Sequence, residues 1–205
     1  QLQLTNACNL ACAYCCTNSG RPRDGEVCFE QLRTVVRQIP ETLGPDALLG
    51  PEGAGFSAVL RVLEKGRVGI AALSAGILRA ALDRAVEHAT TRIQFGKAIA
   101  EFQGVSFRVA DMACDYEAAR LLIESAARKI DEGAPDAGRA ASMAKLFASE
   151  AAVRGTSAAV QIHGGAGYIR GVEVERLFRD ARVTMIYEGT SEVQRMIISR
   201  SYLRA

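Results

Sequence analysis

The sequence of 205 residues contains no tryptophan, only two histidines and almost no excess charge, since 25 lysines and arginines stand against 23 aspartates and glutamates. A net charge of +2 gives no indication that the protein binds nucleic acid or another polyanion. A run of about 20 apolar residues, which a membrane span requires, is also missing, so no span is expected. What the chain has instead is 49% hydrophobic residues with many alanines, a composition that suits closely packed helices.

The six cysteines are unevenly distributed, because four of them stand between residues 8 and 16. Such crowding favours metal binding in a reducing compartment over a disulfide framework. We therefore expect a cytoplasmic protein.

The segment around these cysteines has a specific spacing. Residues 1–5 alternate like a strand, and the pattern Cys-x3-Cys-x2-Cys follows, with a tyrosine before its last cysteine. This arrangement resembles the cluster loop of the radical SAM enzymes, which implies a [4Fe-4S] cluster with one iron open to S-adenosylmethionine. The ligands would be Cys8, Cys12 and Cys15. Two alternatives remain open, a zinc site completed by Cys16 or Cys28 and a thiol cluster without a metal.

The radical SAM resemblance covers only a short part of the chain. After the cysteine loop the sequence predicts one amphipathic helix over residues 29–39, which Pro40 terminates, and no glycine-rich SAM-binding strand follows. One strand and one helix cannot bury a core, so residues 1–44 are expected to form a short irregular, cysteine-rich segment. A loop rich in proline and glycine then marks the start of a second domain, residues 45–205.

Helical periodicity dominates this second domain. We expect five helices, over residues 56–90, 102–132, 136–162, 172–182 and 191–203. The second has one apolar face, made of Val105, Val109, Met112, Tyr116, Ala119, Ile123, Ala126 and Ile130. On the third, Met143, Phe147 and Ala151 should point inward, and Asp136 should cap its start. Long antiparallel helices with short connections predict an all-α, up-down helical bundle.

The first of these helices contains three glycines, Gly66, Gly69 and Gly76. Each costs about 1 kcal/mol relative to alanine in a helix interior. Their presence indicates close helix contacts or a ligand lying against the backbone. The alternative is that this stretch forms two helices.

The stretch before the last helix places one carboxylate, Glu188, between a tyrosine and a glycine. Ser191 followed three residues later by Gln194 is a capping-box pattern, so a helix should begin there. A carboxylate in such a place can act as a base. The alternative is that an acidic residue stands there only because helix N-termini favour negative charge.

Three motifs together resemble one protein family. Tyr-Glu-Gly-Thr-Ser-Glu-x-Gln at 187–194 follows Arg-Asp-Ala-Arg at 179–182, and Leu-Leu-Gly-x-Glu-Gly-x-Gly-Phe stands at 48–56. Residues 45–205 are thereby similar to the C-terminal helical domain of the acyl-CoA dehydrogenases. The resemblance implies a flavoprotein that oxidises an acyl-CoA to the trans-2-enoyl-CoA with FAD and passes electrons to an electron-transfer flavoprotein. It also implies that Glu188 removes the α-proton and that the protein is a homodimer or homotetramer.

The same resemblance implies which residues bind the substrate. These are Glu64, Arg67, Tyr187 and Gly189. Branched-chain members of the family carry their base at the position of Gly66, where this sequence has no carboxylate, so Glu188 is the candidate that remains. An alternative for the charged residues around Gly66 is a solvated helical turn.

The cofactor residues that the resemblance implies fall in three segments. They are Arg92, Gln94, Phe95, Gln103, Gln161, Gly164, Gly165, Thr190, Ser191 and Glu192. Arginine suits a pyrophosphate because its planar fork donates two parallel hydrogen bonds, and glycines let a nucleotide approach the backbone. In the family the first two segments address the FAD of a neighbouring subunit. Alone, each segment would be read as an ordinary helix end, and His163 is expected to be structural.

One departure from the family leaves three hypotheses open. In the family an N-terminal helical domain and a β-barrel domain precede the bundle, and residues 1–44 resemble neither. The chain is therefore an acyl-CoA dehydrogenase or its C-terminal domain, an iron-sulfur radical enzyme fragment, or a helical assembly module without turnover. Flavin retention and an iron assay distinguish these hypotheses.

Overall fold

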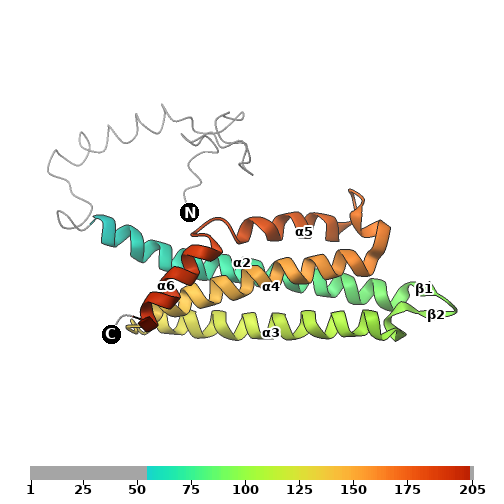
Figure 1. Cartoon of the computed structure of the whole chain (residues 1–205), viewed down its shortest axis with the longest axis horizontal. Coiled ribbons are helices and arrows are strands. Elements are labelled where there is room, and N and C mark those ends of the chain that lie inside the picture. The colour runs from blue at the N-terminus through green and yellow to red at the C-terminus, as the bar shows by residue number, and fades with distance from the viewer. Residues whose placement is uncertain (1–54, 204–205) are drawn as a thin grey trace, which may run out of the picture. The chain divides into compact units, whose positions relative to one another are not determined.

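The computed structural model describes residues 55–203, with side chains from Val62 onward (Figure 1). The elements are α2 (Gly55–Thr91), β1 (Ile93–Gln94), β2 (Lys97–Ala98), the 3-10 helix η1 (Ile99–Glu101), α3 (Gln103–Asp131), α4 (Ala137–His163), the 3-10 helix η2 (Gly164–Tyr168), α5 (Glu173–Thr184) and α6 (Ser191–Leu203). The predicted all-α helical class is confirmed. No helix in this described part is long and apolar enough to cross a membrane. The predicted boundary at residue 44 and the N-terminal cysteines lie outside the described residues.

The three long helices α2, α3 and α4 run side by side, and α5 lies along the same stack (Figure 1). Helix α6 crosses the bundle near the start of α4, whereas the β1–β2 hairpin lies at the opposite end. One core cluster joins Leu82 of α2, Met112 of α3, Ile162 of α4 and Leu177 of α5. This arrangement places the α5–α6 turn and the hairpin at different ends of the molecule.

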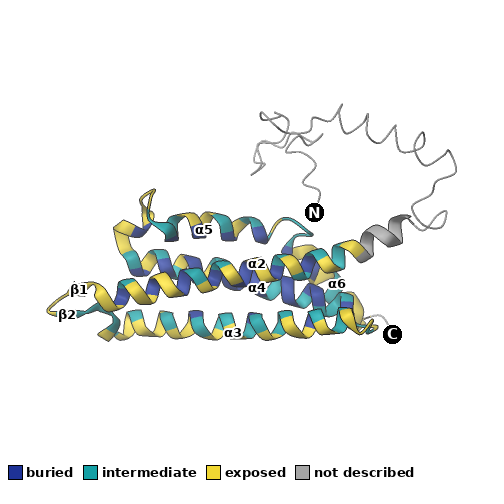
Figure 2. Ribbon diagram, turned by 180° about the vertical axis from the view of Figure 1, so that it is seen from behind, coloured by how far each residue is buried: buried dark blue, intermediate teal, exposed yellow. Residues whose placement is uncertain are grey.

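Alanine makes up most of the core, and α4 supplies the largest share of it (Figure 2). Its buried alanines are Ala137, Ala141, Ala144, Ala148, Ala151, Ala152 and Ala159. Small side chains let helix backbones approach closely at interior packing density. At Gly155 the approach is closest, since an added Cβ would lie 2.1 Å from Leu78 Cδ1 of α2. The predicted inward residues of α3 and α4 are confirmed as buried or half-buried.

The glycines of α2 correct one prediction. The stretch forms a single helix of 37 residues, not two. Gly69 and Gly76 are exposed, and an added Cβ at either would meet nothing within 4 Å, so the close-contact explanation is wrong for both. It holds for Gly66, where an added Cβ would meet Glu188.

One predicted helix cap is wrong, and the other, Asp136, stands at the N-cap position of α4 without a side-chain capping bond. The Thr190 carbonyl accepts the Gln194 backbone N–H, so Thr190 precedes α6 and Ser191 is its first residue. The Asp136 carboxylate makes no capping bond at α4, because Lys129 and Arg139 bind it instead. A charged partner within reach attracts a carboxylate more strongly than a helix N–H does.

The hairpin after α2 was not anticipated. Ile93 pairs with Ala98 and Gln94 with Lys97 in antiparallel register. Its turn is formed by Phe95 and Gly96, with φ of +52° and +82°. Positive φ at both central residues is the geometry that closes a two-residue hairpin, although the position of Phe95 normally favours asparagine or glycine.

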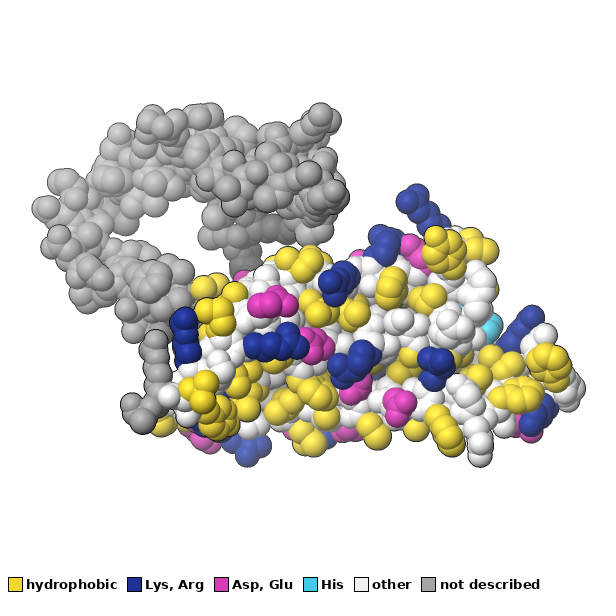
Figure 3. Space-filling model, viewed as in Figure 1, with side chains coloured by type: hydrophobic (Ala, Val, Ile, Leu, Met, Phe, Trp, Pro, Cys, Tyr) yellow, Lys and Arg dark blue, Asp and Glu magenta, His cyan; other side chains and the backbone are white. Residues whose placement is uncertain are grey.

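The surface agrees with the balanced composition. Figure 3 shows acidic, basic and apolar side chains interspersed over the described part of one face. Many of the charges are neutralised within one helix, as in the Arg79–Asp83 and Arg120–Glu124 pairs. Such exposed pairs contribute little to stability.

Candidate functional site

The turn between α5 and α6 holds the predicted base. It is closed by a hydrogen bond of 3.0 Å from the Ser191 N–H to the Met185 carbonyl. Within it Glu188 and Gly189 both have left-handed backbone conformations, with φ of +53° and +90°. A side chain at Gly189 would be strained and would also lie 2.6 Å from Gln194 Nε2. The sequence Glu-Gly therefore fits a turn in which the second residue must be glycine.

The Glu188 carboxylate lies against the backbone of α2. A Cβ added at Gly66 would be 2.7 Å from Glu188 Oε2 and 3.4 Å from Oε1. Oε2 is buried and has no hydrogen-bond partner among the described residues. A carboxylate oxygen that is shielded from water and accepts no hydrogen bond is chemically suited to accept a proton.

Arg67 follows Gly66, the α2 residue against which this carboxylate lies, and is 8% exposed. Its Nε has no hydrogen-bond partner in the described chain. Burial lowers the pKa of the Arg67 guanidinium, and the nearby Glu64 and Glu188 carboxylates oppose that shift. The site thus holds a buried cation with a free donor beside a buried acceptor.

Two further polar residues contact this turn: Lys145, for which no role was predicted, and Gln194, which was predicted only as part of a capping box. Both side chains are fully buried, at 0% exposure. Lys145 Nζ donates to the Gly189 carbonyl at 2.8 Å, and Gln194 Nε2 donates to the same oxygen at 2.8 Å. Burial lowers the pKa of Lys145 to about 8, although the acidic residues Glu188, Glu192 and Glu150 oppose the shift. A lysine in phase with the buried face of alanines on α4 was the sequence signal for this residue.

The remaining predicted substrate residues lie around the same turn. Tyr187 is half-buried and precedes the base directly. Glu64 is half-buried one turn of α2 away from Arg67, and a Cβ at Gly138 would lie 2.6 Å from its Oε1. Glu64 therefore rests on the start of α4, and the structure brings α2, α4 and the α5–α6 turn together here.

Thr190, Ser191 and Glu192 differ in accessibility. The Ser191 hydroxyl is buried without a partner among the described residues, so it faces the interior. Glu192 is exposed, and hydrogen bonds from its own N–H and from the Thr190 hydroxyl hold its carboxyl pKa below the usual value. Thr190 and Glu192 are the members of this segment that a ligand can reach.

The other predicted cofactor residues lie at the opposite end of the bundle. Arg92, Gln94 and Phe95 belong to the end of α2 and its hairpin, and all three are exposed, Phe95 at 92%. Gln103 begins α3 and is also exposed. The Phe95 ring meets Phe102 edge-on, with centroids 6.1 Å apart.

The glycine loop after α4 lies at this same end. Gly164 and Gly165 are exposed, with nothing within 4 Å of an added Cβ, so their backbone is open to a ligand. Gly167 is different, since an added Cβ would lie 2.8 Å from the Val160 carbonyl. Gln161 is exposed on the last turn of α4. The open backbone at Gly164 and Gly165 leaves room for a ligand at the same end of the bundle as Arg92.

A histidine pair joins the hairpin end of α2 to the glycine loop. The rings of His88 and His163 stack with centroids 4.2 Å apart and planes inclined by 20°. His163 Nδ1 donates to the Ala159 carbonyl at 2.8 Å, which fixes its ring. Burial lowers the pKa of His88, and the charges of His163 and Arg92 add to that effect. The structural role predicted for His163 is therefore shared with His88.

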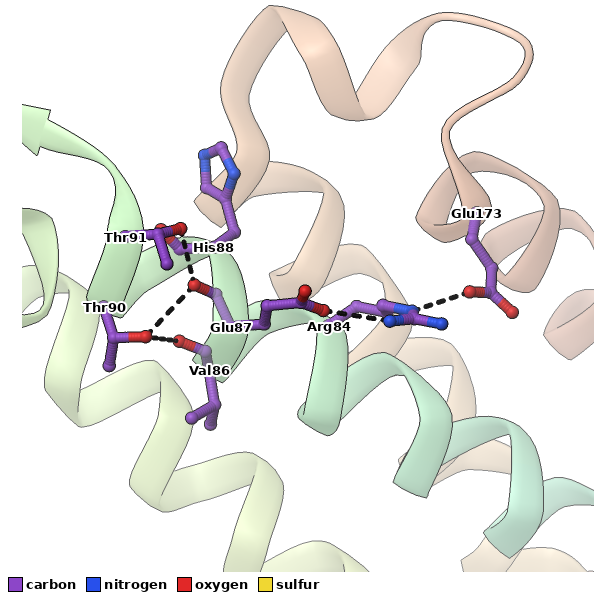
Figure 4. A network of polar contacts seen from close by, with 7 residues as sticks. All are labelled: Arg84, Val86, Glu87, His88, Thr90, Thr91 and Glu173. Carbon is purple, nitrogen blue, oxygen red and sulfur yellow. Dashed lines mark hydrogen bonds and ion pairs between the residues drawn. The ribbon is translucent and has the colours of Figure 1, made fainter.

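Polar contacts hold the end of α2 around His88 (Figure 4). Arg84 donates to Glu87 of its own helix and to Glu173 at the start of α5. The hydroxyls of Thr90 and Thr91 donate back to the Glu87 carbonyl. The Arg84–Glu173 bond therefore joins α2 to α5 about two turns before the hairpin, whereas the threonine bonds stay within the end of α2.

The two groups of predicted cofactor residues are well separated. Lys145, which contacts the base turn, and Gln161 are 16 residues apart on α4, or about 24 Å at the helical rise. The groups therefore form two sites in one chain and not one pocket.

Both sites contain backbone strain. Phe95 and Glu188 are the two non-glycine residues with positive φ in the described range. A left-handed conformation costs such residues about 1–2 kcal/mol. Strain of this kind persists where the surroundings hold it and is typical of functional sites.

Comparison with known proteins gives a consistent result. Residues 53–203 match the family described as Acyl-CoA dehydrogenase, C-terminal domain. An acyl-CoA dehydrogenase of Bacillus subtilis (strain 168) is 54% identical over 160 residues, which are 78% of this chain and 42% of that protein. The caffeyl-CoA reductase-Etf complex subunit CarC of Acetobacterium woodii is 49% identical over 156 residues, 76% of this chain and 41% of that protein.

A solved structure agrees with these matches. Butyryl-CoA dehydrogenase from Megasphaera elsdenii superimposes with a TM-score of 0.74 and 48% identity, over 76% of this chain and 40% of that chain. The chain thus spans about two fifths of the length of these relatives. Cys8, Cys12 and Cys15 lie outside both the described residues and the family match.

Proposed function

Because the chain belongs to the acyl-CoA dehydrogenase family, whose C-terminal domain matches residues 53–203, we propose that it takes part in the α,β-dehydrogenation of an acyl-CoA thioester. The product is a trans-2-enoyl-CoA. Glu188 is the proposed base. The observation that carries the proposal is its buried Oε2, which lies against Gly66 with no partner among the described residues.

The chemistry explains why the base needs this environment. The α-proton of a thioester is only weakly acidic, so the carboxylate that removes it must be poorly solvated. Glu188 would take the α-proton, and the electrons of that C–H bond would form the double bond as the β-hydrogen leaves with its electron pair. FAD, when bound, would supply the acceptor for that hydride. Arg67 and Tyr187 would line the reacting end of the substrate.

FAD fits the exposed end of the bundle in chemical terms. Arg92 supplies a forked cationic donor for the pyrophosphate, and Gly164 and Gly165 leave backbone open to the nucleotide. These groups lie about 24 Å along α4 from the base turn. As the family resemblance implies, we propose that the two ends serve different flavins and that the functional unit is a homodimer or a homotetramer.

The electrons are proposed to leave through an electron-transfer flavoprotein. The support is that one relative with 49% identity is a subunit of a reductase-Etf complex.

The N-terminal cysteines remain a separate prediction. Cys8, Cys12 and Cys15 are proposed to bind a [4Fe-4S] cluster that is open to S-adenosylmethionine. Iron and sulfide analysis of the chain purified without oxygen tests this directly. Less than one iron per chain would contradict it.

The dehydrogenase proposal is tested by the visible spectrum of the chain purified without oxygen, with FAD and then butyryl-CoA added. Flavin bands that bleach with butyryl-CoA are the expected result. The matched control is Glu188→Gln, which keeps the shape of the side chain and removes the base. This variant should retain flavin without bleaching, whereas bleaching at the wild-type rate would overturn the role of Glu188.

A chain that retains no flavin would favour the helical assembly module without turnover. Butyryl-CoA is the probe because one structural relative is a butyryl-CoA dehydrogenase. Longer and branched acyl-CoAs would then define the acyl specificity.

A further inference from the structure

Two buried side chains, one on α4 and one on α6, donate hydrogen bonds to the turn that carries Glu188. Gln194 of α6 donates through Nε2 to the Glu188 carbonyl at 3.2 Å and to the Gly189 carbonyl at 2.8 Å. Lys145 of α4 donates to the Gly189 carbonyl at 2.8 Å. Both consecutive carbonyls of the strained turn are therefore fixed by side-chain donors.

Burial of the Lys145 ammonium costs free energy at this position. It is the largest side chain among those that are less than 2% exposed in the described part of the chain. Its hydrogen-bond acceptor is a neutral carbonyl, and a buried cation without a directly bonded anion costs free energy. An apolar residue of the same length would satisfy the packing as well or better. A role in packing alone does not explain a lysine here.

The turn needs an external restraint because its own geometry opposes it. Glu188 has a φ of +53°, a conformation that non-glycine residues avoid. Gln194 alone would bind the turn from the α6 side, to which the turn is already connected. Lys145 adds a contact from α4, which links the turn to the rigid centre of the bundle.

We propose that Lys145 is a positioning residue for the base: its ammonium binds the Gly189 carbonyl and, together with Gln194, holds the turn so that the Glu188 carboxylate stays against Gly66. The inference rests on the proposed role of Glu188. Loss of Lys145 lets the turn relax, so the carboxylate leaves its place although the bundle stays folded.

The test is hydrogen exchange of the chain, read by mass spectrometry on peptides that cover residues 185–194, for wild type and Lys145→Met. Methionine matches the length of lysine without its charge. The amides of Ser191 and Gln194 are bonded within the turn and report on it. We expect their protection to fall about tenfold, since a hydrogen bond to a charged group is lost. Peptides of α3 should keep wild-type exchange.

The matched control is Lys129→Met, which removes a lysine that pairs with Asp136, nine residues before Lys145 or about 14 Å along α4, and should leave turn exchange unchanged. Unchanged protection of residues 185–194 in Lys145→Met would overturn the proposal, and so would a uniform loss of protection across all helices. If Lys145→Met does not fold, Gln194→Met removes the other side-chain donor to the Gly189 carbonyl, and hydrogen exchange of residues 185–194 tests the same proposal.

The kinetics of flavin bleaching distinguish a role of Lys145 in positioning Glu188 from a role in the stability of the bundle. In the flavin-loaded protein, Lys145→Met should lower the rate of bleaching by butyryl-CoA at least tenfold with little change in the butyryl-CoA concentration for half-saturation. Exchange requires neither flavin nor substrate. Unchanged exchange in Lys145→Met therefore rejects the positioning role of Lys145. Absent bleaching in the wild-type protein rejects only the dehydrogenase proposal.

Discussion

The Glu188 carboxylate occupies the space that a side chain at Gly66 would need: a Cβ at Gly66 would lie 2.7 Å from Glu188 Oε2. The two residues are far apart in sequence, yet the absence of atoms at one makes room for the functional group of the other. The glycine in α2 is thus explained by packing against the Glu188 carboxylate, the proposed base, which its helix propensity does not reveal.

Gly66→Ala should displace the carboxylate without unfolding the helix, because the atoms it meets are the flexible end of a side chain. A misplacement of about 1 Å can cost roughly 100-fold in rate, so flavin reduction by butyryl-CoA should fall by about that factor. The control is Gly69→Ala, which is exposed with nothing nearby and should raise the unfolding free energy by about 0.5–1 kcal/mol. Wild-type bleaching in Gly66→Ala would show that the carboxylate need not stay there.

Replacement of Glu188 itself should reveal the strain in its backbone. Glu188→Gly should be more stable than Glu188→Ala by about 1 kcal/mol, since glycine adopts a φ of +53° without the steric cost. Urea unfolding of the two variants measures this difference. Equal stability would mean that the turn relaxes once the carboxylate is gone.

Gly155→Ala should destabilise the bundle through overpacking. Its new methyl would lie 2.1 Å from Leu78 Cδ1, and both residues are buried. Insertion of one methyl into a packed core costs about 1–3 kcal/mol, which urea unfolding can measure. In combination with Leu78→Ala the added cost should shrink, because the clash partner is removed. Strict additivity of the two changes would argue against the clash.

The pH dependence of stability should report on His88. Burial and the charges of His163 and Arg92 lower its pKa in the folded state below the unfolded value of 6.5. The unfolded chain therefore binds more protons as the pH falls below about 6.5, and the folded state loses stability in that range. His88→Phe keeps a stacking ring without a titrating group. Urea midpoints at pH 7.5 and pH 5.5 should differ less in this variant than in wild type, and an equal difference would exclude His88 as the cause.

Lys145 should give the opposite trend in the alkaline range. Its folded pKa of about 8 lies below the unfolded value of 10.5, so above pH 8 the unfolded chain binds more protons. Stability should then rise with pH relative to Lys145→Met, because deprotonation removes the cost of the buried charge. Parallel stability curves of the two proteins between pH 7.5 and pH 10 would contradict this.

The sequence by itself determined the elements of the described part. Apolar residues at helical spacing, with Gly133 and Pro135 as breaks, predicted helices whose ends agree with the structure to within about two residues. Periodicity reports which face is buried and needs no knowledge of the partner. The motif around Glu188 likewise indicated the base and the family, because its residues are contiguous.

Only the tertiary structure decided how that motif is held. The contacts of Glu188 with Gly66, of Lys145 with Gly189 and of His88 with His163 each join different elements, which local patterns cannot pair. The missing side-chain cap at Asp136 has in part the same origin, since its carboxylate binds Lys129 of another helix as well as Arg139 of its own. A buried polar side chain bonds to whichever donor or acceptor lies within reach in the folded chain, because leaving it without a hydrogen bond costs free energy.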